Sequence, residues 1–137
     1  MNQYIAKIAL LVKDYDEAIN YYTRILNFQL IEDTTISKTK RWVVLAPQGS
    51  DSCQLLLAKA VTKEQRHAIG NQSGGRVFLF LYTDDFERDY QRLVDHNVTI
   101  VREKSIEKYG KVAVFSDLYG NLWDLIEPSA VVQSSHS

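Results

Sequence analysis

The first half of the chain changes from strand-like to helix-like spacing of its apolar residues and back again. The apolar run at residues 6–12 predicts a strand that is covered on both faces. Asp14, with Glu17 three positions later, has the pattern of a helix-capping box. Apolar residues then recur every three or four positions until Asn27, which can end a helix in the left-handed conformation. Further strands are predicted at 28–35, 41–46 and 53–58, with a turn at 47–52, so the predicted order is βαβββ.

The second half repeats this order at a constant offset. A strand is predicted at 77–82, a helix from a second capping box of Asp84 and Glu87, and strands at 98–101, 112–116 and 122–126. A shift of 70 positions superimposes the capping boxes, the helix ends and the last strands, which predicts an internal duplication. Because a unit of about 60 residues does not bury its sheet alone, the two units should pair their sheets in one α+β domain.

These boundaries divide the chain into four segments. We expect a first βαβββ unit at 1–60, a linker with a short surface helix at 61–75, a second βαβββ unit at 76–129 and a flexible tail at 130–137. Residues 1–129 should together form one domain. Within the second unit, the segment 104–111 is predicted as a loop, which either closes over a binding site or remains a plain solvated connection.

Composition narrows the possible functions. The 137 residues are 45% hydrophobic, which is enough for a folded core, and 16 basic against 17 acidic residues give a net charge of −1. Because the chain has no run of like charge, neither nucleic acid nor an anionic membrane is expected as a partner. No apolar run approaches the roughly 20 residues of a membrane helix, and the first residues do not resemble a secretory signal. The single cysteine, Cys53, excludes an internal disulfide, so we expect a cytoplasmic protein.

One carboxylate lies where the pattern predicts an apolar surface. The residues Tyr-Gly-Asn at 119–121 are typical of a tight turn, and the alternation that follows predicts a strand. Within that strand, Asp124 shares a face with Leu122 and Ile126. A charge on such a face costs free energy unless it has a partner. Asp124 is therefore a candidate functional residue.

Several short motifs in both halves are shared with one known family. Leu26-Asn27-Phe28 stands where that family has Leu-Gly-Phe, and residues 117–121 read Asp-Leu-Tyr-Gly-Asn where it has Asp-Pro-Asp-Gly-Asn. With these motifs, residues 5–128 resemble the vicinal oxygen chelate superfamily, which includes glyoxalase I, extradiol dioxygenases and the bleomycin- and fosfomycin-resistance proteins. The resemblance implies that two curved mixed sheets form a cup around a small-molecule site, and that the protein is a homodimer.

Metal-dependent members of this superfamily have ligands, commonly His and Glu, on the first and last strand of each unit. The resemblance assigns these positions to Lys7 and Gln54 in the first unit, and to Val77 or Phe78 and Asp124 in the second. A protonated lysine donates hydrogen bonds but does not coordinate a metal, and Val77 and Phe78 carry no donor atom. Gln54 and Asp124 alone fall short of the three protein ligands typical of catalytic zinc. We therefore expect neither a bound metal nor another cofactor.

Two groups of residues are candidates for ligand binding in the cup. Lys7 and Asp124 are expected to form an ion pair bridged by Gln54; alternatively, Lys7 reaches solvent and Asp124 caps a backbone group. Aromatic residues on or near strands could line a pocket for a flat or apolar ligand, with Arg41 as an anchor for an anionic group, although core packing is the competing explanation for each. These aromatic residues are Trp42, Phe78, Phe80, Tyr82 and Tyr109.

These observations favour a metal-independent protein of the glyoxalase and bleomycin-resistance type that sequesters a small organic molecule in its cup. Sequestration needs only shape, an apolar lining and a few placed polar groups. Two alternatives stay open. One is an enzyme, either a glyoxalase-like lyase or isomerase or a dioxygenase-like protein, in which Lys7 or Asp124 moves a proton or an unrecognised metal acts. The other is a structural or interaction domain whose cup is filled.

Overall fold

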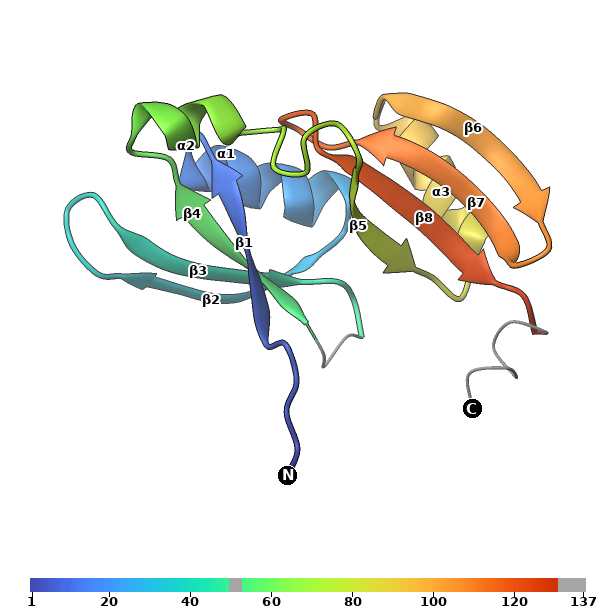
Figure 1. The fold of residues 1–137 in the computed structure, drawn as a ribbon, viewed down its shortest axis with the longest axis horizontal. Coiled ribbons are helices and arrows are strands. Elements are labelled where there is room, and N and C mark those ends of the chain that lie inside the picture. Colours follow the sequence, from blue (N-terminus) through green and yellow to red (C-terminus); the bar gives the residue numbers. More distant parts are fainter. Residues whose placement is uncertain (50–52, 131–137) are drawn as a thin grey trace. The chain divides into compact units, whose positions relative to one another are not determined.

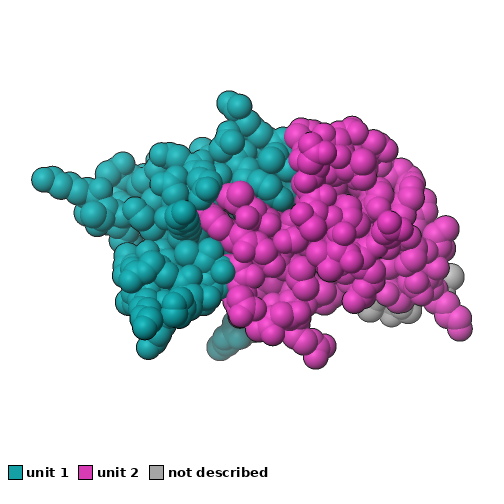
Figure 2. All heavy atoms as spheres, turned by 90° about the horizontal axis from the view of Figure 1, so that it is seen from above, with its two compact units in different colours: residues 1–69 teal, residues 70–137 magenta. Residues whose placement is uncertain are grey.

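The computed structural model describes residues 1–49 and 53–130. The chain divides into two compact units, Met1–Ile69 (unit 1) and Gly70–Ser137 (unit 2), which are coloured separately in Figure 2. The division falls inside the segment 61–75, which the sequence marks as a linker. Part of the predicted turn at 47–52 and almost all of the predicted tail at 130–137 lie outside the described residues. None of the helices in the described part is long and apolar enough to cross a membrane.

Unit 1 is a four-stranded mixed sheet with helices packed against it (Figure 1). Its elements are β1 (Lys7–Val12), α1 (Tyr15–Asn20), the π-helical turn η1 (Tyr21–Ile25), β2 (Gln29–Thr35), β3 (Arg41–Ala46), β4 (Gln54–Lys59) and α2 (Lys63–Ala68). The strand order is β1-β4-β3-β2, with β1 parallel to β4 and the other neighbours antiparallel. Helix α1 packs against β3 and β4, and alternate strand residues such as Leu10 and Leu57 are buried in the core.

Unit 2 repeats this arrangement. Its elements are β5 (Val77–Tyr82), α3 (Phe86–Asp95), β6 (Ile100–Glu107), β7 (Gly110–Ser116) and β8 (Leu122–Pro128), in the strand order β5-β8-β7-β6. Helix α3 packs against β7 and β8, and its first backbone N–H, from Phe86, donates a 2.8 Å hydrogen bond to the side chain of Glu127 on β8. Side chains alternate along a strand, so Trp123 and Leu125 share the α3 face with Glu127. Asp124 lies on the opposite face.

The predicted fold class is confirmed, because both units have the order βαβββ and both sheets are mixed. The duplication is also visible in the backbone. The helical segment of each unit ends at an asparagine in the left-handed conformation, Asn27 at φ 63° and Asn97 at φ 56°, and these residues are 70 positions apart. Asp14 caps α1 as predicted, since its side chain accepts a 2.8 Å hydrogen bond from the backbone N–H of Glu17.

Two predicted boundaries in unit 2 were wrong. Helix α3 is capped by Asp85, one residue later than predicted, and Asp84 forms an ion pair with the Arg88 side chain instead. The segment 104–111 is not an open loop, because β6 continues to Glu107 and a tight turn that contains Tyr109 leads directly into β7. The residues of β6 do not alternate between apolar and polar, so their pattern does not predict a strand. Pairing with β7 across the hairpin extends β6 nevertheless.

Candidate functional site

A buried carboxylate holds the turn that precedes β8. The Oδ1 atom of Asp117 accepts hydrogen bonds from the backbone N–H groups of Tyr119, Gly120 and Asn121, at 3.0, 3.1 and 3.0 Å. Its Oδ2 atom accepts from the side-chain amide of Asn121 at 3.2 Å and from the indole N–H of Trp123 at 3.1 Å. This network fixes the point at which β8 begins and therefore the face on which Asp124 lies.

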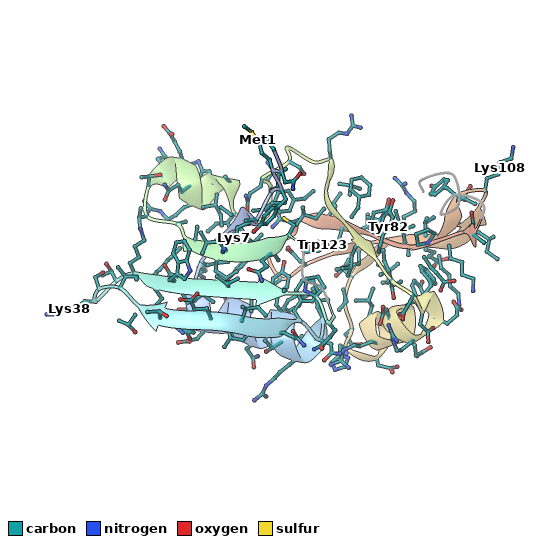
Figure 3. All side chains as sticks on the ribbon, turned by 90° about the horizontal axis from the view of Figure 1, so that it is seen from below. Met1, Lys7, Lys38, Tyr82, Lys108 and Trp123 are labelled. Atoms are coloured by element: carbon teal, nitrogen blue, oxygen red, sulfur yellow. The ribbon has the colours of Figure 1, made fainter. Side chains whose placement is uncertain are left out.

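The face of the unit 2 sheet opposite α3, which we call the site face, carries a row of residues from all four strands. Phe80 on β5 is in register with Asp124 on β8, Asp124 with Val114 on β7, and Val114 with Arg102 on β6. Because adjacent strands lie about 4.8 Å apart, each member of the row neighbours the next. The row beside it consists of Tyr82, Ile126, Val112 and Ser105. Figure 3 labels Tyr82 on this sheet.

Asp124 carries a buried polar atom without a partner. Its Oδ1 atom is buried and forms no hydrogen bond with the residues that the structure describes. Burial raises the pKa of the Asp124 carboxyl, and attraction by the Arg102 guanidinium opposes this rise. The carboxyl group can therefore accept a hydrogen bond from a ligand, or it can hold a proton itself.

The raised pKa makes the stability contribution of Asp124 dependent on pH. A carboxyl group whose pKa is higher in the folded state stabilises that state below its unfolded pKa of about 3.9 and loses this contribution as the pH rises through the folded pKa. Replacement by asparagine removes the titration. Because solvent screens this half-buried group, we expect Asp124→Asn to be more stable than the parent by only about 1 kcal/mol at neutral pH.

The higher stability of Asp124→Asn should disappear below pH about 4, where the carboxyl group of the parent is protonated in both the folded and the unfolded state. Denaturant unfolding at a series of pH values measures the difference directly. A variant less stable than the parent at neutral pH would contradict the prediction. That result would support a partner for the ionised carboxylate, such as the predicted pair with Lys7.

Two large aromatic side chains lie exposed beside Asp124. Phe80 is 62% and Tyr82 is 63% exposed, and both come from the edge strand β5. Exposed aromatic groups gathered on one face often mark a surface that binds another molecule. Phe78 is half-buried and lies at an irregularity of the β5–β8 register, between Val77 and Leu79. The residue beside Asp124 is thus Phe80, and neither Val77 nor Phe78 occupies that place in the register.

The structure brings three of the candidate residues of unit 1 to one face of its sheet. Lys7 on β1 is in register with Gln54 on β4. Strand alternation and the β3–β4 register place Trp42, which is 36% exposed, on the same face. The ion pair expected between Lys7 and Asp124 would join the two units, and it stays a prediction.

Arg41 and Tyr109 have local partners. The Arg41 guanidinium forms ion pairs with Asp16 at 2.8 Å and Asp33 at 2.7 Å, and it lies 5.3 Å from the centre of the Tyr15 ring. Its hydrogen bonds lower the pKa of Asp33. An anionic ligand would have to compete with two carboxylates for Arg41. Tyr109 is half-exposed in the β6–β7 turn, where its carbonyl group accepts the backbone N–H of Ser129.

Sequence reasoning missed Arg102, because the predicted strand ended at residue 101 and no local pattern marked the next residue. The cross-strand register to Val114 reveals its place on the site face. Among the described residues, no group of three or more His, Cys, Asp or Glu side chains could hold a metal ion. The expected absence of a metal stays a prediction.

Comparison with known proteins identifies the class. A family model of the glyoxalase/bleomycin resistance protein/dioxygenase superfamily matches residues 4–125, so the chain belongs to this superfamily, as predicted. An uncharacterized protein of Shewanella frigidimarina (strain NCIMB 400) is 57% identical over 93% of this chain and 95% of its own length. The crystal structure of UcmS2 is 27% identical with a TM-score of 0.80, over 93% of this chain and 99% of that chain. TnmS3, an antibiotic binding protein from Streptomyces sp. CB03234, is 27% identical with a TM-score of 0.76, over 93% and 98%.

Proposed function

We propose that this protein binds a small organic molecule with an aromatic part on the site face of unit 2, and sequesters it without chemical change. The observation that carries the proposal is the unpartnered Oδ1 atom of Asp124 beside the exposed rings of Phe80 and Tyr82. A ligand that stacks on the rings would cover their exposed apolar surface, and a hydrogen bond from the same ligand would give the buried Asp124 oxygen a partner. Sites of this kind combine apolar contact with a few placed polar groups.

The relatives support this class of function. TnmS3 is an antibiotic binding protein of the same fold, and its identity of 27% extends over almost the whole chain. The residues at the family's metal-ligand positions support binding without a metal, because none of Lys7, Val77 and Phe78 can serve as a ligand. We also retain two expectations: a homodimer, which the superfamily implies, and a location in the cytoplasm, which the single cysteine favours.

The test is binding of aromatic antibiotics by variants of the site face, measured by titration calorimetry. We expect Phe80→Ala and Tyr82→Ala each to weaken binding about tenfold, since each removes a stacking surface worth about 1.4 kcal/mol. Ile106→Ala serves as the matched control, because Ile106 is an 83% exposed apolar residue of β6 in register with Lys111, off the site face. Unchanged affinity in both aromatic variants would contradict the proposal.

Asp124 also supports a second candidate function, a lyase or isomerase in which its carboxyl group moves a proton. Burial brings its pKa closer to neutrality, as proton transfer requires. Mass spectrometry of the ligand after incubation separates the two functions. Recovery of unchanged ligand supports sequestration, whereas product that forms in the parent and not in Asp124→Asn supports the enzyme.

A further inference from the structure

The strand β6 presents two basic side chains that face in opposite directions. Arg102 is in register with Val114, and Ser105 is in register with Val112, so two residues of β6, at 103 and 104, lie opposite one residue of β7. This β-bulge reverses the alternation between Arg102 and Ser105. Lys104 therefore turns to the α3 face, where its Nζ atom pairs with Glu87 at 3.0 Å and lies 5.2 Å from the centre of the Tyr90 ring.

Arg102 remains on the site face. Its side chain is exposed and has no hydrogen bond or close ion pair within the described part of the chain, and its guanidinium attracts the Asp124 carboxylate from a distance. Two other basic residues of unit 2 do form ion pairs, since Arg88 pairs with Asp84 and Asp89, and Lys104 with Glu87. Bulges commonly redirect a side chain next to a functional site. Here the bulge leaves an exposed guanidinium, without a direct hydrogen-bonding partner in the described part of the chain, in the row that contains Asp124.

The row contains three chemically different side chains in order across the sheet. Phe80 offers an aromatic surface, Asp124 beside it offers an unpartnered acceptor, and Arg102 lies two strands beyond Asp124, about 10 Å between backbones. The buried aliphatic side chain of Val114 separates the two charged residues. A guanidinium recognises carboxylate and sulfonate groups through paired hydrogen bonds.

We infer that the ligand of the proposed site is an aromatic acid, and that Arg102 determines this specificity by binding its anionic group. The ring would lie against Phe80 and Tyr82, a hydroxyl or amino group of the ligand would donate to Asp124, and the acidic group would meet Arg102. This inference rests on the proposed function, because it requires that an aromatic molecule binds to the site face. To the proposed function, the inference adds that the ligand is anionic and that Arg102, which the sequence pattern did not mark, binds its charged group.

Two fluorescent probes with one aromatic body test the inference. 8-Anilinonaphthalene-1-sulfonate carries an anionic group, and N-phenyl-1-naphthylamine is its uncharged counterpart. We expect Arg102→Gln to weaken binding of the sulfonate about tenfold while it leaves the uncharged probe within about twofold. Arg102→Lys should restore part of the lost affinity, because it restores the charge without the paired donors.

Lys104→Gln is the matched control, since it removes the same charge from the same strand on the opposite face. It should leave both probes within about twofold of the parent. Equal effects of Arg102→Gln on the two probes, or equal effects of Arg102→Gln and Lys104→Gln on the sulfonate, would overturn the inference alone. Failure of both probes to bind, or full binding of both in Phe80→Ala, would overturn the proposed function together with it. Circular dichroism confirms that each variant is folded before its affinities are compared.

Discussion

Replacement of Asp117 by alanine is expected to lower the free energy of unfolding of unit 2 by about 4 kcal/mol. The Asp117 side chain is only 6% exposed and accepts hydrogen bonds from the backbone of its own turn and from the side chains of Asn121 and Trp123. Alanine removes the shared acceptor. A buried donor left without a partner costs about 1–3 kcal/mol, and water can reach only some of these donors.

The two tryptophans make this measurement specific to one unit. Trp42 belongs to unit 1 and Trp123 to unit 2, so in a Trp42→Phe background the fluorescence reports on the region around Asp117. Denaturant unfolding of Asp117→Ala in this background gives the loss of stability. Asp95→Ala, at an exposed aspartate of α3, is the control and should change stability by less than about 0.5 kcal/mol. A loss below about 1 kcal/mol for Asp117→Ala would show that the network contributes little.

Replacement of Gly70 by alanine is expected to destabilise unit 2 by about 3 kcal/mol. Gly70 has a φ of +75°, and a Cβ atom at this position would lie 1.8 Å from the carbonyl oxygen of Tyr119. This is far inside the van der Waals contact distance, so either the backbone at Gly70 or the turn at Tyr119 must move. Movement of the turn would also disturb the hydrogen bonds to Asp117.

Gly74→Ala is the matched control for this effect. Gly74 has a similar φ of +67°, but a Cβ atom there would meet nothing within 4 Å. The loss of stability in Gly74→Ala should therefore reflect only the conformational penalty of alanine in the left-handed region, about 1 kcal/mol. Both variants are measured by the same fluorescence experiment. Equal losses would mean that the contact with Tyr119 relaxes without cost, against the prediction.

Both predictions concern the support of the candidate site. Asp117 and Gly70 contact the turn from which β8 starts, and β8 carries Asp124. A shift of β8 by one residue would exchange its two faces. The position of Asp124 on the site face therefore depends on residues that do not themselves belong to it.

Much of the local structure could be predicted because its causes lie within a few residues. Asp14 caps α1 through the backbone N–H of Glu17, three positions away, and Asn27 ends the helical segment through its own backbone conformation. The wrong prediction of the α3 cap was also local, because it chose the residue next to the true cap. Asp84 and Asp85 are both good capping residues, and the choice between them depends on how the strand before them meets the helix.

The candidate site could be predicted only in part. Strand alternation placed Asp124 opposite Trp123, and it correctly marked Phe80 and Tyr82 as residues of a strand. It did not predict that Arg41 pairs with Asp16, 25 positions earlier, because that contact depends on how α1 and β3 meet. It also missed the bulge of β6, which separates the directions of Arg102 and Lys104.

The sequence by itself therefore determined the α+β class, the duplicated βαβββ order, the first helix cap and the face of Asp124, since each follows from side-chain chemistry within one segment. Only the tertiary structure decided which residues lie beside Asp124 and which carboxylates engage Arg41. The physical reason is that cross-strand register and β-bulges arise from pairing between distant segments. A shift of a single residue in such a pairing changes every neighbour of a site while the pattern along each strand remains the same.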